Sequence, residues 1–290
     1  MKLLKIFLLL FSFAAFFTVK GQSVDEPTRN FNDFYEKQLL PQREVMPYHP
    51  LREIDVVWET HIWRTIDLRE KFNQYFYFPI EPKGSQGRRN FAYTVWDAIV
   101  ANEIPIYEDD EFKIPIDNDE FVFRYTKADT IILEIEDDEE NYEYKTVLVP
   151  KEFNSEDILQ LRLKESWYLE KQTTGQYVRI LGFTMVRNLY KEVGLDRDFI
   201  GSVELFWIPM QDPRVRKLLV TNEAYYADNI ANLPTWDEIF LSRRFDSYII
   251  RESNVFNRSV SSYLTGIDAI IESERIEQML FEIGSDQWEY

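Results

Sequence analysis

The stretch LQLRLKESWYLE, residues 159–170, alternates apolar and polar side chains along most of its length. The apolar residues that share one face are Leu159, Leu161, Leu163, Trp167 and Leu169. The polar residues on the opposite face are Gln160, Arg162, Lys164 and Glu170. Successive side chains of an extended strand point to opposite sides, so this alternation predicts a β-strand with one buried face.

The neighbouring segments predict an antiparallel sheet around that strand. The sequence Thr-Thr-Gly at 173–175 favours a turn, and residues 177–186 are apolar on both faces, as in a central strand. Residues 203–208, VELFWI, predict the next strand, and residues 144–149 predict an earlier one that ends at Pro150. Asn154 offers an N-cap for a short turn ahead of the alternating strand.

Residues 51–73 show a different spacing, which favours a helix. Apolar residues recur at intervals of four: Ile54, Trp58, Ile62 and Ile66. On such a helix Asp67 and Lys71 would form an ion pair in the favourable acid-first order, and Arg64 would reach Asp67.

The end of this segment, WRTIDLREKFN at 63–73, carries both charge and aromatic residues. One interpretation is a core helix that buries Trp63 and has a salt-bridged outer face. The alternative is that Arg64, Arg69 and Glu70 contact a protein partner, because Trp and Arg are enriched at interface hot spots.

Further helices are expected on either side of the sheet. Residues 91–99 predict a short helix, ended by Pro105, and Thr235 with Glu238 forms a capping box that starts another. An amphipathic face nearer the C-terminus comprises Val260, Tyr263, Leu264, Ile267 and Ile271. The sequence therefore predicts an α+β fold over residues 51–290: a single mixed domain with a central antiparallel sheet and flanking helices.

Two segments precede this domain. Residues 1–21 combine early lysines, an apolar run and a small residue before Gln22, as in a cleaved secretory signal peptide. Residues 22–50 read as an extended N-terminal arm, whose regular structure is interrupted by Pro41, Pro47 and Pro50. The entropy lost on ordering this arm exceeds what its apolar residues would return. Several aromatic residues are unusual in a simply disordered tail, so we expect Phe31, Phe34 and Tyr35 to dock on a partner, which would order the arm.

Composition limits the classes of partner. The net charge is −18, and removal of a leader rich in lysine makes the mature chain more acidic still. Nucleic-acid binding depends on Lys and Arg that neutralise phosphates, and anionic lipids repel an acidic protein, so both partners are disfavoured. The chain has no cysteine, which excludes disulfides, thiolate chemistry and a lipid anchor on an N-terminal cysteine.

Catalytic signatures are weak. The two histidines, His49 and His61, show no metal-binding spacing, and neither a G-x-S-x-G motif nor a glycine-rich phosphate loop occurs. Residues 117–120, DNDE, lack the turn glycine of a calcium loop. Abundant carboxylates leave one enzymatic alternative open, a periplasmic carbohydrate-active enzyme or glycan-binding module, although glycines for tight substrate loops are few. We expect no cofactor, no metal and no catalytic activity.

Several separated motifs resemble the GldN/PorN family of gliding-motility and type IX secretion proteins. They are VVWETHIWRTIDLREKFN at 56–73, LKESWYLEKQTTGQYVRILGF at 163–183, ELFWIPMQDPRVRKLL at 204–219, TWDEIFLSRRFDSYIIRESNVFNRSVSSYLTGIDAIIESERI at 235–276, and DQWEY at the C-terminus. The arm and the acidic segment 107–143 carry little of this signature.

The resemblance implies a structural role and a location. Proteins of this family are periplasmic partners of an outer-membrane lipoprotein, GldK/PorK, with which they form a ring that meets the motor subunit GldM/PorM. The machine exports proteins across the outer membrane of Bacteroidetes and supports gliding. The resemblance therefore implies a non-enzymatic ring subunit that self-associates at the inner face of the outer membrane without inserting into it.

Overall fold

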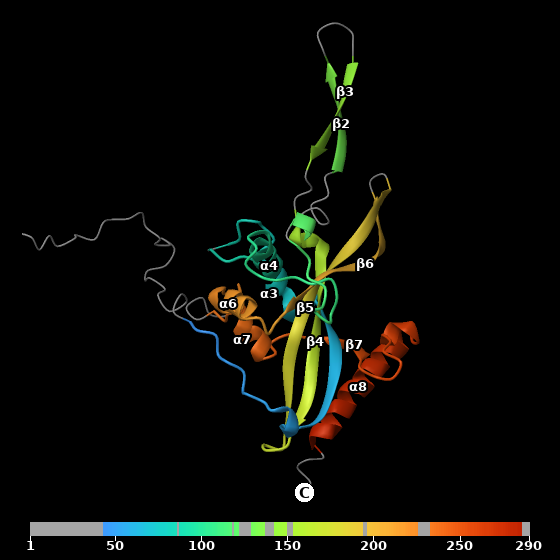
Figure 1. Ribbon diagram of the computed structural model, residues 1–290. Coiled ribbons are helices and arrows are strands. Elements are labelled where there is room, and N and C mark those ends of the chain that lie inside the picture. The colour runs from blue at the N-terminus through green and yellow to red at the C-terminus, as the bar shows by residue number, and fades with distance from the viewer. Residues whose placement is uncertain are drawn as a thin grey trace, which may run out of the picture. The chain divides into compact units, whose positions relative to one another are not determined.

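The alternating stretch forms strand β4 (Ile158–Glu170) in the middle of a five-stranded antiparallel sheet (Figure 1). The computed structural model describes residues 43–85, 87–117, 119–121, 129–136, 142–149, 153–193, 196–225 and 233–285. The strand order in the sheet is β6-β5-β4-β1-β7. The predicted α+β class with a central antiparallel sheet and flanking helices is confirmed.

Strands β4, β5 and β6 are neighbours both in the chain and in the sheet, so they form a meander. Strand β1 lies on the other side of β4, and β7 forms the edge next to β1. Their bounds are β1 (Val56–Asp67), β5 (Gly175–Val193), β6 (Asp196–Pro209) and β7 (Tyr248–Glu252). The predicted turn joins β4 to β5, because Glu170 pairs with Gly175. Strands β2 (Asp129–Glu136) and β3 (Tyr142–Val149) form a separate two-stranded sheet.

The helix expected over residues 51–73 is wrong, because most of this segment is strand β1. A spacing of four is a multiple of two, so Trp58, Ile62 and Ile66 share one face of a strand as well as one face of a helix. Strand β1 pairs with both β4 and β7, which places it inside the sheet. The segment is also rich in β-branched and aromatic residues, which favour strands.

The helices begin with side-chain caps where the sequence provides them. Asn90 caps α4 (Phe91–Val100) by accepting from the Tyr93 N–H, and Asp212 caps α6 (Pro213–Thr221) by accepting from the Arg214 N–H. The capping box predicted at Thr235 is present at the start of α7 (Trp236–Leu241). The described residues also include the helices α3 (Gln74–Tyr77) and α8 (Ile267–Ser285).

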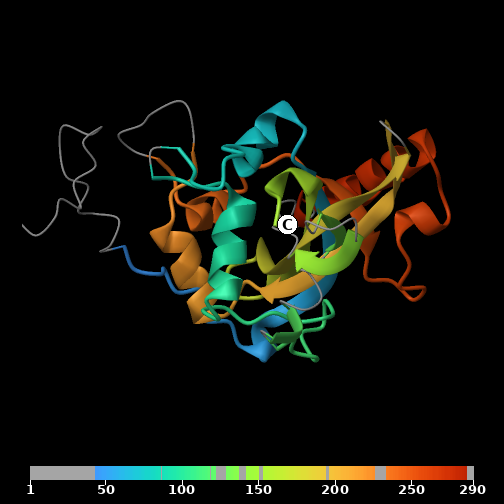
Figure 2. The ribbon, with the colours of Figure 1, turned by 90° about the horizontal axis from the view of Figure 1, so that it is seen from above.

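Helices α3, α4, α6 and α7 gather at one flank of the sheet, and α8 lies along β7 at the other, as two views show (Figures 1 and 2). Aromatic side chains fill the contact between this group of helices and the sheet. The ring of Trp236 lies 5.4 Å from that of Phe76 and 5.2 Å from that of Phe91. Phe91 in turn lies 5.3 Å from Phe183 of β5, so helices and sheet share this core.

A second, smaller apolar cluster joins α8 to the sheet through Ile62, Ile249, Ile276 and Leu280. The C-terminal third of the sequence was expected to be helical, but it also contributes strand β7, which pairs with β1. Helix α8 begins at Ile267, later than the predicted amphipathic face, and both Ile267 and Ile271 are exposed rather than buried. Within the described ranges, no helix combines the length and apolarity needed to cross a membrane.

Candidate functional site

The signature segment places Trp63 and Arg64 on opposite faces of β1, because successive residues of a strand point to opposite sides. Both residues are buried, with exposed fractions of 6% and 2%. Each of them contacts charged side chains from other strands, helices or loops. Two polar clusters therefore lie back to back in the middle of the sheet.

The cluster on the Arg64 side is built around the carboxylate of Glu165, which is fully buried. Its oxygens accept hydrogen bonds from Arg243 Nη1 at 2.7 Å and from Trp167 Nε1 at 3.0 Å. Arg64 Nε lies 3.2 Å from Glu165 Oε2, and Arg64 Nη1 donates to Glu277 of α8 at 3.0 Å. Two cations and two anions thus tie β1, β4, the end of α7 and α8 together.

This cluster also separates the two apolar cores on the same face of β1, since Ile66 packs in the first core and Ile62 in the second. Arg64 Nε and Nη2 are buried without a hydrogen-bond partner, so the contact from Nε to Glu165 is an ion pair with poor hydrogen-bond alignment. The guanidinium also lies over the Trp167 ring at 5.7 Å. These contacts have a structural role inside the chain itself.

The cluster on the opposite face surrounds the ring of Trp63. Arg251 of β7 lies 3.5 Å from the ring centroid and Lys164 of β4 lies 5.4 Å from it, so two cations flank one aromatic side chain. Asp110 accepts from Trp63 Nε1 at 2.8 Å and from Arg251 Nη2 at 2.6 Å. Burial lowers the pKa of Lys164, and nearby Asp110 opposes that shift.

The turn after β1 carries the exposed part of the signature. Arg69 donates to both carboxylate oxygens of Asp67, at 2.9 and 2.5 Å, and these hydrogen bonds hold the pKa of Asp67 below its usual value. The fully buried Asn73 donates to the backbone carbonyls of Asp67 and Asp246, each at 2.9 Å. The helical ion pairs expected from Asp67 to Lys71 and from Arg64 to Asp67 are wrong, because the segment is not helical.

The six residues predicted to contact a partner fall in three different places. Arg64 is buried among residues of its own chain, so it does not share an outer face with the other two charged residues. Arg69 and Glu70 are exposed at the turn. Partial desolvation at this turn raises the pKa of Glu70, and the nearby carboxylates of Asp246 and Asp67 add to the shift. Phe31, Phe34 and Tyr35 lie outside the described residues. The contact of Arg69 and Glu70 with a partner stays a prediction.

The last residues of the predicted arm, 43–50, dock on their own chain, which differs from the expectation that the arm is not ordered by its own contacts. The ring of Tyr48 lies between two guanidinium groups, 4.4 Å from Arg216 and 4.7 Å from Arg179. Backbone carbonyls of the arm also accept from these arginines, Met46 from Arg216 at 3.2 Å and His49 from Arg179 at 3.1 Å. Burial is the main cause of a raised pKa of Tyr48.

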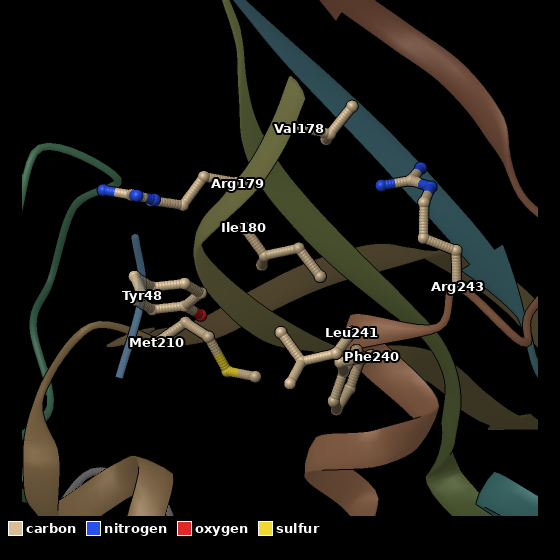
Figure 3. A pocket seen from close by; sticks show the side chains of 8 residues that line it. All are labelled: Tyr48, Val178, Arg179, Ile180, Met210, Phe240, Leu241 and Arg243. Atoms are coloured by element: carbon tan, nitrogen blue, oxygen red, sulfur yellow. The ribbon is translucent and has the colours of Figure 1, made fainter. Parts of the chain in front are cut away.

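A small hollow opens beside this ring (Figure 3). Its lining residues are Tyr48, Val178, Arg179, Ile180, Met210, Phe240, Leu241 and Arg243. The pairing of Tyr48 with arginines far along the chain was not foreseen, and the aromatic residue amid the prolines of the arm was the only sequence signal for it. The hollow presents mostly apolar walls and two arginine side chains.

The histidines do not form a recognisable catalytic arrangement. Ser166 Oγ donates to Glu59 Oε1 at 2.6 Å, and His61 Nε2 lies 3.3 Å from the same oxygen. The carboxylate therefore lies between hydroxyl and imidazole, whereas a catalytic triad needs the imidazole next to the hydroxyl. His49 is 3.6 Å from Glu170. Over the part of the chain that the structure describes, no group of three or more His, Cys, Asp or Glu side chains could hold a metal ion.

Comparison with known proteins agrees with the sequence motifs. The family described as "Gliding motility associated protein GldN" matches residues 51–289, which is most of the chain and begins where the arm ends. No curated protein gives a match. Nothing found favours the carbohydrate-active or glycan-binding alternative.

Proposed function

The chain belongs to the GldN family of gliding-motility and type IX secretion components, and from this premise we propose that it is a non-enzymatic periplasmic subunit of that machinery. In this role it assembles with further copies of itself into a ring, together with an outer-membrane lipoprotein of the GldK/PorK type. The ring meets a motor subunit of the GldM/PorM type and supports protein export across the outer membrane.

The family match over residues 51–289 is the observation that carries this proposal. The family is one of structural components rather than a known family of enzymes. A chain without cysteine has no site for N-terminal lipidation, so its attachment to the outer membrane would come from the lipoprotein partner. A leader at residues 1–21 would direct it to the periplasm.

The turn after β1 is the surface that we propose for one of these contacts. Arg69 and Glu70 project there next to Phe72, whose side chain is 55% exposed. An arginine, an aromatic ring and a carboxylate on one exposed turn are suited to an interface, because Arg and aromatic residues dominate binding energy at protein contacts. In the same proposal, the arm residues Phe31, Phe34 and Tyr35 dock on the lipoprotein or on a neighbouring copy.

A deletion strain complemented with variants tests the proposal. We expect loss of secreted protein from the culture medium on deletion, recovery with the wild-type gene, and reduced recovery with the double substitution Arg69→Ala and Glu70→Ala. The matched control is Arg214→Ala. Arg214 is 61% exposed against 62% for Arg69, and it binds Asp212 two residues earlier with the same two-pronged geometry.

The two substitutions separate a partner contact from a general effect of removing an exposed arginine. Equal secretion by the Arg69/Glu70 variant and the Arg214 variant, at equal protein levels, would remove the turn from the interface. Normal secretion by the deletion strain would refute the proposed function itself.

A further inference from the structure

Helix α8 (Ile267–Ser285) carries apolar side chains on two opposite sides. The inner side is fixed to the sheet: Ile276 and Leu280 are fully buried, and Ser273 Oγ accepts from the Ile249 N–H at 2.8 Å. Gln176 of β5 adds a hydrogen bond to the Leu280 carbonyl at 2.9 Å, and Glu277 binds Arg64. These contacts determine which side of the helix faces outward.

The outer side carries four large apolar residues in solvent. Their exposed fractions are 74% for Ile267, 61% for Ile270, 56% for Ile271 and 72% for Phe281. Positions three, four and fourteen residues after Ile267 lie on one side of an α-helix, within about 60° of it at 3.6 residues per turn. A helix of a soluble domain normally has one apolar side, so this second one marks an interaction surface.

The apolar character continues at the start of the helix. Phe256, in the loop before α8, is 73% exposed, and its ring lies 4.9 Å from Arg258. Arg258 also lies over Tyr263 at 4.3 Å, and Tyr263 donates to Glu272 of α8 at 3.2 Å. This chain of contacts holds the loop against the helix and places a further aromatic residue near it.

The charges on the exposed surface of α8 are mainly acidic. Asp268, Glu274 and Glu282 are exposed, and Arg275 is engaged by Glu272 through two hydrogen bonds of 2.8 and 2.6 Å. An occupant of the outer side must therefore combine an apolar stripe with positive charge. A second copy of α8 would bring like charges together, and an anionic lipid surface would be repelled.

We propose that the outer side of α8 docks a basic amphipathic helix of a different protein, with Ile267, Ile270, Ile271 and Phe281 packed against its apolar stripe and Asp268 and Glu274 facing its cations. Helix-on-helix recognition of this kind places apolar residues at intervals of three and four on both partners. The inference rests on the proposed function, because it identifies a docking surface for a partner within an assembly.

A peptide-binding measurement tests this surface with purified protein that lacks only the predicted leader. The probes are two labelled amphipathic peptides of equal length, one built from leucine and lysine and the other from leucine and glutamate. We expect fluorescence anisotropy to detect binding of the lysine peptide, no binding of the glutamate peptide, and a loss of affinity as salt is raised.

Substitutions then locate the binding. Ile267→Ser with Ile271→Ser should weaken binding of the lysine peptide about tenfold or more, because two side chains lose their buried contact. Asp268→Lys with Glu274→Lys should weaken it comparably. The controls are Val203→Ser with Leu241→Ser, which are 47% and 46% exposed on other elements, and Glu53→Lys, which is exposed ahead of β1. All these positions are exposed, so each variant should remain folded, with a small loss of melting temperature for Asp268→Lys because it replaces an acidic residue in the first turn of α8.

Each outcome decides the proposal. Equal loss in the control variants, or equal binding of both peptides, would show nonspecific attraction and overturn it. Self-association that is abolished by Ile267→Ser with Ile271→Ser would assign the surface to a second copy, and sedimentation with anionic vesicles would assign it to lipid; either result overturns the proposal. Because the assay uses purified protein, its failure leaves the proposed role in secretion standing, whereas normal secretion by the deletion strain refutes only that role.

Discussion

Arg64 Nε and Glu165 Oε2 lie 3.2 Å apart on the neighbouring strands β1 and β4, and both side chains are almost completely buried. Arg243 and Glu277 complete the group from the end of α7 and from α8. A buried ion pair gives little net stability compared with apolar residues of the same shape, but removal of one partner leaves an uncompensated charge. This group therefore makes attachment of the helices to the sheet sensitive to single substitutions.

Glu165→Gln should destabilise the protein strongly. It leaves the buried guanidinium of Arg64 with only the partly exposed carboxylate of Glu277, and it removes the anion that Arg243 binds. The expected loss is about 3–5 kcal/mol in the free energy of unfolding. Glu274→Gln, at an exposed position of α8, should change it by less than about 0.5 kcal/mol. Urea unfolding measures both, and equal midpoints for the two variants would contradict this role of Glu165.

Two substitutions of Trp63 test the cluster on the face of β1 opposite Arg64. Trp63→Ala removes a buried ring and the surface that Arg251 and Lys164 cover, so we expect a loss of about 3–5 kcal/mol. Trp63→Phe keeps an aromatic ring and removes the hydrogen bond to Asp110, with an expected loss of about 1–2 kcal/mol. Unfolding curves that order the variants differently would refute the packing of this cluster.

The sheet was predictable where alternation was unbroken, and β1 shows where the sequence was ambiguous. The period of two in β4, the apolar run in β5 and the turn between them correctly identified these strands. The expectation that β4 buries one face only is wrong, because Lys164 and Glu170 of its polar face are buried as well. In β1 the apolar spacing of four fitted both a helix and a strand, and the correct signal was composition: Val56, Val57, Trp58 and Thr60 favour strands. The short strand β7 has five residues, too few for a periodic pattern to identify.

The candidate site was less predictable, because its contacts join distant segments. Glu165 sits among the apolar residues of β4, and the sequence does not reveal that Arg64 and Arg243 neutralise it. The same limit applies to Asp110, which meets Trp63 only through the fold. The exposed pair Arg69 and Glu70 was identified as charged surface, although on a turn and not on a helix.

The hydrogen bonds from Arg69 to Asp67 should make the stability of the protein depend on pH in the acidic range. The pKa of Asp67 is below its ordinary value of 3.8 because Arg69 donates to the carboxylate. A carboxyl group whose pKa is lower in the folded state than in the unfolded state stabilises the protein at pH values above its unfolded-state pKa. This stabilisation is lost as the pH falls through the folded-state pKa.

Arg69→Ala should therefore raise the pKa of Asp67 and cost up to about 1 kcal/mol at neutral pH, since the arginine is largely exposed. The stability difference between variant and wild type should vanish at pH values below the folded pKa. NMR titration of the Asp67 carboxyl and unfolding at several pH values measure these effects. An unchanged Asp67 titration in the variant would show that the pair does not persist in solution.

The two parts of the arm, residues 22–42 and residues 43–50, should respond differently to mutation. Deletion of residues 22–42 removes the predicted partner contacts of Phe31, Phe34 and Tyr35 and should leave the free energy of unfolding unchanged while preventing assembly. Tyr48→Ala removes the ring held between Arg179 and Arg216 and should cost about 1–3 kcal/mol, whereas Tyr48→Phe keeps the ring and should cost less. Hydrogen exchange at residues 43–50 reports the docking, and equal exchange in Tyr48→Ala and wild type would contradict it.

The most direct test of the central claim is native purification of the tagged chain from the cell envelope, followed by mass spectrometry and electron microscopy of the same fraction. We predict that an outer-membrane lipoprotein copurifies in a fixed ratio and that the particles are closed rings containing many copies of the chain. A chain that elutes as a monomer, with neither lipoprotein nor rings in the fraction, would contradict its proposed role as an assembly subunit.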